Sequence, residues 1–266
     1  MGHYRAVSQS YTACFASLGY LHNQTSNIYT HLIASVVFLG WAVQTFNDVL
    51  TRYSTSEFND VLVFGVFFAC AAGCFGSSAL FHLFANHSAE ANGKWLLFDL
   101  YGVFGLISAT IVSGAYYGFY CDRAWWLAYS GGIIVISALC GLFCTLPRFR
   151  HHSWRNVRAV LFVLIGCYGI LPMNHVAQRW GRHKVNEMIG WEILRWEGVS
   201  YLAGALIYCF RIPERFTPGT FDIFGASHQI FHACAVLGAV LHYQALLVGF
   251  DYSHNPSTRQ CEYSSG

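Results

Sequence analysis

Residues 61–84 read VLVFGVFFACAAGCFGSSALFHLF, an apolar run that contains no Asp, Glu, Lys or Arg. A helix needs about 20 predominantly apolar residues to cross the hydrocarbon core of a bilayer. The run is too long for a strand, and it is too continuous for the amphipathic helix of a soluble bundle. This stretch therefore predicts a transmembrane helix.

Six other runs have the same character or nearly so, and polar segments such as 47–60 separate them. The fifth run is short and ends at Pro172, and the sixth contains Arg195 and Glu197, so that its first turn is expected at an interface. The predicted fold is an all-α bundle of seven transmembrane helices, at 27–46, 61–84, 95–119, 125–146, 157–173, 193–210 and 223–250. The remainder is expected to form a short N-terminal segment, 1–26, and a polar C-terminal tail, 251–266, around the membrane domain 27–250.

The composition agrees with a membrane protein. Charged residues make up 11% of the 266 residues, against about 25% in soluble domains. A net charge of +2 gives no reason to expect nucleic acid as a partner. The 10 cysteines form no CxxC pair, so we expect small apolar core residues rather than a zinc ribbon or a redox motif.

The distribution of Lys and Arg favours a cytosolic N-terminus only slightly. Seven crossings place eight of these residues on the side of the N-terminus and seven on the other side. The strongest local signal is the group of arginines within 148–158, which lies between two predicted helices. We therefore predict a cytosolic N-terminus and an external C-terminus. In this orientation the sequons at Asn23 and Asn86 face the cytosol and would never be glycosylated.

Five polar residues lie inside or at the ends of the predicted spans, where ionisable groups are costly and therefore usually functional. They are Ser78, His82, Asp99, His228 and His232. The second helix ends, and the third and seventh begin, on the side of the N-terminus. All five residues are therefore expected in one layer of one leaflet.

This set has the chemistry of an open zinc site. Two histidines at i and i+4, His228 and His232, point from one helical face, and His82 supplies a third imidazole. Three protein ligands leave the fourth position of zinc to water, which Asp99 can hold or deprotonate, with Ser78 as a hydrogen-bond partner. Copper, iron and nickel also accept imidazole.

Each residue also has a plainer interpretation. A single intramembrane histidine can simply bond a neighbouring helix, Asp99 can sit in a first helical turn favoured by the dipole, and Ser78 can be a packing residue. His31, with Asn27, lies in the same layer, where capping at the interface is favoured over hydrogen bonding to the metal ligands. His242 follows His232 by ten residues, about 15 Å along a helix, and is too deep to join the site.

The residues 21–32, LHNQTSNIYTHL, resemble the first-helix signature of the progestin and adipoQ receptor family, which includes the adiponectin receptors, fungal homologues and haemolysin-III-like proteins. The segments SALFH at 78–82, with Asp99 after it, and HQIFH at 228–232 are similar to its second and third motifs. These motifs are most similar to those of the fungal members of the family. The segment before Leu21 is short, so no regulatory cytosolic domain is expected.

The resemblance implies seven helices with an internal N-terminus and an external C-terminus. It also implies Zn²⁺ bound by His82, His228 and His232, with Asp99 and Ser78 nearby, a role in lipid and metal homeostasis, and ceramide hydrolysis in some members. Ligand and substrate do not carry over with it. The expected partner is a membrane lipid, ceramide-like or sterol-like, and a protein ligand stays unidentified.

Three functions remain open from the sequence. The first is a zinc amide hydrolase acting on ceramide-like lipid, with Asp99 as the base. The second is a receptor in which zinc only joins helices, although structural zinc usually has four protein ligands. The third is a zinc transporter or sensor, which the restriction of the polar set to one leaflet disfavours.

Overall fold

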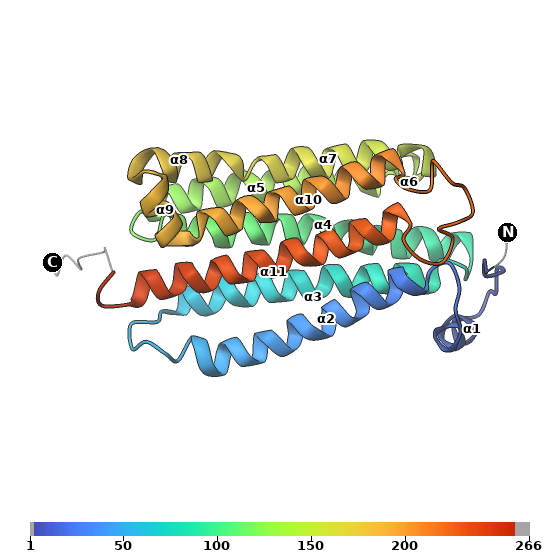
Figure 1. Cartoon of the computed structure of the whole chain (residues 1–266), viewed down its shortest axis with the longest axis horizontal. Coiled ribbons are helices and arrows are strands. Elements are labelled where there is room, and N and C mark those ends of the chain that lie inside the picture. Colours follow the sequence, from blue (N-terminus) through green and yellow to red (C-terminus); the bar gives the residue numbers. More distant parts are fainter. Residues whose placement is uncertain (1–2, 259–266) are drawn as a thin grey trace.

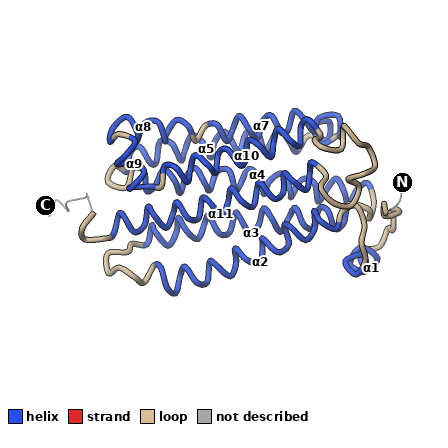
Figure 2. The backbone as a smooth tube through the Cα atoms, in the orientation of Figure 1, coloured by secondary structure: helices blue, strands red, loops and turns tan. Residues whose placement is uncertain are grey.

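A computed structural model describes residues 3–258, and every regular element in this range is helical (Figures 1 and 2). The long helices are α2 (Thr25–Gln44, continued by a π-helical turn, Thr45–Val49), α3 (Phe58–Phe84), α4 (Ala89–Gly118), α5 (Arg123–Thr145), α7 (Arg155–Cys167), α8 (Ile170–Trp180), α10 (Trp191–Phe210) and α11 (Ser227–His254). The short elements are α1 (Tyr11–Ala16), α6 (Pro147–Arg150), α9 (Arg182–Ile189) and two 3₁₀ turns, Ser17–Gly19 and His152–Trp154.

The long helices lie side by side along the long axis of the molecule, with the described ends of the chain at opposite ends of the bundle (Figure 1). Helix α11 packs most extensively on α10 and also contacts α2, α3, α4 and α9. Helix α3 packs between α2 and α4. A residue on the inner face of α11 therefore meets side chains from several other helices.

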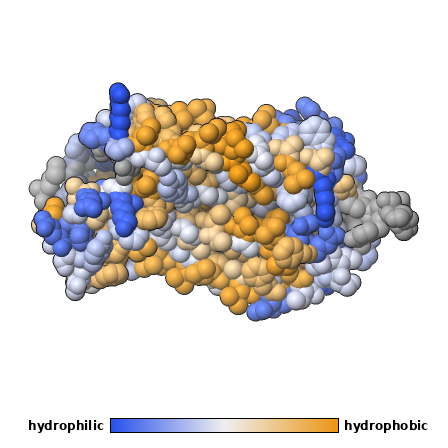
Figure 3. All heavy atoms as spheres, turned by 180° about the vertical axis from the view of Figure 1, so that it is seen from behind, coloured by the Kyte–Doolittle hydropathy of each residue, from blue (hydrophilic) through white to orange (hydrophobic). Residues whose placement is uncertain are grey.

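The outer surface of the bundle matches a lipid environment. On the face shown in Figure 3, apolar residues cover the middle of the bundle and polar residues gather at both ends. Large apolar side chains are exposed on the outer faces of the helices, among them Leu39, Leu139, Leu164 and Leu206. Within residues 3–258, six helices are long and apolar enough to cross a bilayer. The chain is an integral, multi-pass membrane protein.

The sixth predicted span corresponds to α10, which is not among these six helices. It carries Glu192, Arg195 and Glu197 in its first two turns. Glu192 and Arg195 pair with each other at 2.8 Å near the end of the bundle. Glu197 is buried instead, and its carboxylate binds the His242 ring at 2.9 Å. Glu197 therefore lies inside the bundle, where α11 supplies its partner.

The boundaries of the fifth and the last predicted helix also differ from those in the structure. The fifth run does not end at Pro172, because that residue lies in the first turn of α8, where a missing N–H breaks no helical bond. The interruption lies at Tyr168 and Gly169 instead. The last helix begins four residues later than expected, after Gly225 adopts a φ of 81°. It continues past Phe250 to His254, and residues 259–266 of the predicted tail lie outside the described range.

Candidate metal centre

Three histidines converge at the end of the bundle that holds the N-terminus. His82 lies in the last turn of α3, whereas His228 and His232 lie in the first two turns of α11. One ring nitrogen from each lies within 4.8 Å of the other two. The Nε2 atoms of His82 and His228 are 3.1 Å apart. The structure therefore brings together the three histidines that the predicted alternation of helix direction places in one leaflet.

The donor set fits a zinc ion. Zinc binds imidazole nitrogen at 2.0–2.1 Å, which places two tetrahedral ligand atoms about 3.3 Å apart. The 3.1 Å separation of the two Nε2 atoms is close to this value, and the 4.8 Å limit for the set needs only small side-chain movements. His82 and His232 are nearly inaccessible to solvent, so a polar partner for these rings has to come from within the site.

Hydrogen bonds fix which nitrogen of His82 faces the cluster. Its Nδ1 lies 2.8 Å from Gln24 Oε1, a carbonyl oxygen that also accepts a bond from Asn27 Nδ2 at 2.8 Å. Since that oxygen only accepts, the Nδ1 of His82 must carry the proton. Its Nε2 therefore presents a lone pair to the other two histidines, as a metal ligand requires.

The protonated nitrogen of His232 follows in the same way, from a longer hydrogen bond. Thr30 donates its hydroxyl proton to the carbonyl of Ser26 at 2.7 Å. Its oxygen can then accept from Nδ1 of His232, at 3.4 Å. Both rings thus direct Nε2 toward the cluster. His31 stacks on His232, with ring centroids 3.6 Å apart and planes 5° from parallel. The preferred role of His31 as an interfacial cap is wrong, since the ring is buried.

Asp99 and Ser78 form the third side of the site. Ser78 is buried one turn before His82, and its side chain is hydrogen-bonded to the Asp99 carboxylate. Asp99 itself does not belong to the group of ligand atoms formed by the three histidines. Asp99 is thereby connected to α3 through Ser78, one turn before His82, and lies outside the group of ligand atoms.

The N-terminal segment contributes a residue that the sequence motifs do not predict. Arg5 donates hydrogen bonds to the carbonyl oxygens of His82 and Leu83, at 2.7 and 2.9 Å, and to the Ser17 hydroxyl at 2.8 Å. These carbonyls are unpaired at a helix C-terminus, where positive charge is favourable. Arg5 therefore caps α3 at the turn that carries His82. A basic residue far from the motif in sequence gives no signal of this role.

Two further buried polar clusters lie away from the site. In the first, the ring nitrogens of His242 bond Ser113 Oγ at 2.8 Å and the Glu197 carboxylate at 2.9 Å, which links α4, α10 and α11. In the second, Asp60 bonds His254 at 3.1 Å and Tyr117 at 3.0 Å. The polar groups of each cluster are hydrogen-bonded to one another. His242 lies outside the metal centre, as its spacing from His232 predicts.

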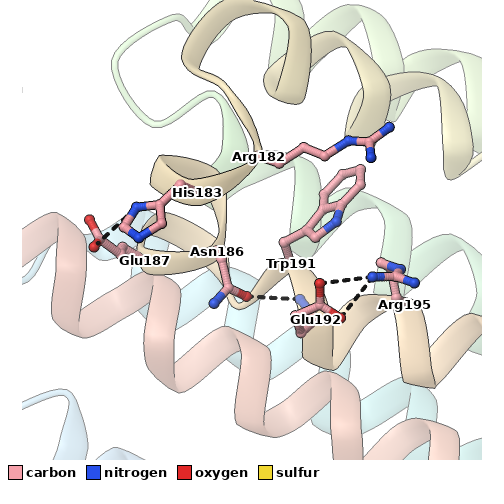
Figure 4. A pocket seen from close by; sticks show the side chains of 7 residues that line it. All are labelled: Arg182, His183, Asn186, Glu187, Trp191, Glu192 and Arg195. Atoms are coloured by element: carbon pink, nitrogen blue, oxygen red, sulfur yellow. Dashed lines mark hydrogen bonds and ion pairs between the residues drawn. The ribbon is translucent and has the colours of Figure 1, made fainter.

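A surface hollow of about 650 Å³ lies around α9 and the start of α10 (Figure 4), at the end of the bundle opposite the N-terminus (Figure 1). Several of its charged groups are already paired: Glu192 with Arg195, and His183 with Glu187. Asn186 accepts the backbone N–H of Glu192. This hollow shares no residue with the histidine cluster, and we do not assign the function to it.

Sequence comparison places these residues in a known family. A profile of the haemolysin-III related family matches residues 19–243. The chain belongs to this family. The predicted resemblance is thereby confirmed. The family match includes all five residues of the candidate site.

Curated relatives come from animals, fungi and plants. The chain is 35% identical over 247 residues to the adiponectin receptor protein of Drosophila melanogaster, covering 92% of this chain and 54% of that protein. It is 31% identical over 253 residues to the ADIPOR-like receptor IZH2 of Saccharomyces cerevisiae (94% and 79%). It is 33% identical over 257 residues to heptahelical transmembrane protein 1 of Arabidopsis thaliana (95% and 76%). The chain thus spans about half the length of the Drosophila relative.

Proposed function

We propose that this family member hydrolyses the amide bond of a ceramide-like membrane lipid at a zinc ion held by His82, His228 and His232. The observation that carries the proposal is the convergence of three imidazole nitrogens within 4.8 Å, from helices α3 and α11, at one end of an apolar bundle. The position suits a substrate that enters from the membrane. Release of a sphingoid base would connect the reaction to lipid signalling, in keeping with the receptor names of the relatives.

Each residue has a role that follows from its surroundings. A zinc ion held by the three histidines would supply Lewis-acid chemistry: it would polarise a carbonyl group and lower the pKa of water toward 7. Asp99, bonded to Ser78 one turn before His82, would accept a proton from the attacking water and pass it to the leaving amine. Ser78 orients the Asp99 carboxylate through their hydrogen bond. Three histidines rather than four protein ligands favour this open site over a purely structural one.

The second candidate function is a signalling receptor in which zinc only joins α3 to α11. The names of the relatives favour a receptor, and they name neither a metal nor an enzyme. Turnover of a defined lipid amide by the purified protein separates the two functions. We expect turnover by the zinc-loaded protein, loss after dialysis against a chelator, and recovery when zinc is restored. Protein that keeps zinc but releases no fatty acid would favour the receptor.

We further propose seven crossings with a cytosolic N-terminus, in which α10 crosses the membrane as the sixth span, in addition to the six apolar helices. The arginines within 148–158 support this orientation, as does the heptahelical name of the Arabidopsis relative. Cys121 is disulfide-bonded and follows α4 at the end opposite the N-terminus. Disulfides persist in oxidising compartments, which supports an external position for that end.

This topology can be tested with glycosylation tags. A tag placed after residue 258 should be modified, because it faces the lumen during synthesis, whereas a tag before Tyr11 should stay unmodified. Mobility shifts that glycosidase treatment reverses would report both results. Native glycans on Asn23 or Asn86 would rule out the proposed orientation.

Gln24 offers a test of the metal centre that leaves the three ligands intact. Gln24→Leu removes the acceptor that holds the Nδ1 proton of His82, so we expect zinc affinity to fall roughly 10- to 100-fold. Gln24→Glu keeps an acceptor oxygen and should retain most of the affinity. Competition with a chromophoric chelator measures both values. Equal affinity in Gln24→Leu and the unmodified protein would show that this bond does not position the ligand.

A further inference from the structure

Buried polar atoms that lack a partner gather around the histidine cluster. In residues 3–258, nine buried side-chain nitrogen or oxygen atoms have no hydrogen-bond partner. Four of the nine belong to residues at this site: Asn27 Oδ1, both ring nitrogens of His31, and His228 Nδ1. Buried polar groups are nearly always hydrogen-bonded, so such a concentration calls for a missing polar partner.

Asn27 and His31 form one continuous polar surface. They lie one turn apart on α2 and therefore share a helical face, and their exposed fractions are 5% and 4%. The amide nitrogen of Asn27 is already bonded to Gln24, which leaves its oxygen free to accept. His31 is fixed between the parallel ring of His232 at 3.6 Å and the ring of Phe75 at 5.0 Å. The edge of the imidazole, not its face, is what remains for a partner.

His31 is not a fourth ligand of the histidine cluster. Its nitrogens do not belong to the group that His82, His228 and His232 form. Its ring is parallel to His232, so the two imidazoles present their edges side by side rather than toward one another. A purely structural role is also a poor account, because neither ring nitrogen makes a hydrogen bond of standard geometry within the described residues.

We propose that Asn27 and His31 are specificity-determining residues that hydrogen-bond a hydroxyl group on the head of the lipid bound beside the histidine cluster. The inference rests on the proposed function and names the head group that the site selects. A free amide oxygen only accepts, and a neutral imidazole offers one donor and one acceptor. A hydroxyl can donate to Asn27 Oδ1 and accept from the N–H of His31, so it pairs one atom of each residue. An ether or ester head has no donor and would leave Asn27 Oδ1 without a partner.

The test compares two lipid amides of equal chain length, one with hydroxyls on the amine portion and one without. Zinc-loaded protein carrying Asp99→Asn binds them without rapid turnover. We expect this parent to bind the hydroxylated amide roughly tenfold or more tightly, because a site built to bond a hydroxyl rejects the analogue that lacks it. Addition of Asn27→Leu or His31→Phe should reduce the preference to about twofold or less, with zinc content unchanged.

Matched controls are Asn47→Leu, at the far end of the same helix, and His183→Phe, whose side chain is 93% exposed. Both should keep the full preference. If the preference persisted in Asn27→Leu and His31→Phe, the assignment of these two residues would be wrong, but the proposed hydrolysis would stand. Loss of zinc in His31→Phe would have the same consequence. Equal binding of the two amides by the parent would mean that water satisfies these atoms. A parent that binds zinc but neither lipid would overturn this assignment and the proposed hydrolysis together.

Discussion

Asp99→Asn should slow hydrolysis of the lipid amide by roughly 10²- to 10⁴-fold, while zinc content stays near that of the unmodified protein. The substitution keeps the shape of the side chain but removes its capacity to accept a proton. The amide oxygen can still accept the bond from Ser78, so the local packing is retained. Asp99 lies outside the group of three imidazoles, and for this reason the metal should remain bound.

The measurement is turnover of a ceramide-like lipid together with zinc content on the same preparation. Asp48→Asn, an exposed acid beyond α2 at the other end of the bundle, is the matched control and should behave like the unmodified protein. Unchanged turnover in Asp99→Asn would remove this residue from the mechanism. Joint loss of zinc and of the folded state would make it a structural residue or a ligand.

His228→Ala combined with His232→Ala should reduce bound zinc from about one ion per chain to background. Two of the three ligands disappear, and His82 alone cannot hold the ion against competing chelators. Both histidines lie in the first turns of α11, and its later contacts with Glu197 and Asp60 are unaffected. The bundle should therefore stay assembled, and helical content by circular dichroism checks this expectation.

The paired control replaces two exposed histidines, His151 and His183, by Ala in one protein. It removes the same number of imidazoles and should keep full zinc occupancy. A protein that lacks His228 and His232 yet retains one zinc would show that the ion binds elsewhere.

The sequence predicts the helices and the meeting of distant residues because both depend on simple rules. Long apolar runs identify the spans. The alternation of direction then places the end of α3 and the start of α11 in one leaflet, and an i, i+4 pair presents two imidazoles together. These steps need no knowledge of side-chain packing, and the structure does bring His82, His228 and His232 within reach of one another.

These rules do not predict which residues surround the three histidines. Gln24 and Arg5 reach His82 from the segment before α2, through bonds that depend on how that segment folds over the end of the bundle. His31 has the character of an interfacial residue until its stacking on His232 is known. Glu197 lies among charged neighbours in sequence, but the rotation of α10 against α11 directs it to His242.

X-ray absorption at the zinc edge of the purified, full-length protein tests the central claim most directly. We predict about one zinc per chain, with imidazole nitrogens at 2.0–2.1 Å and no sulfur neighbour. The same spectrum should vanish in the protein that lacks His228 and His232. A sulfur shell near 2.3 Å would place the ion on cysteines instead, and a protein that binds no zinc would contradict the account.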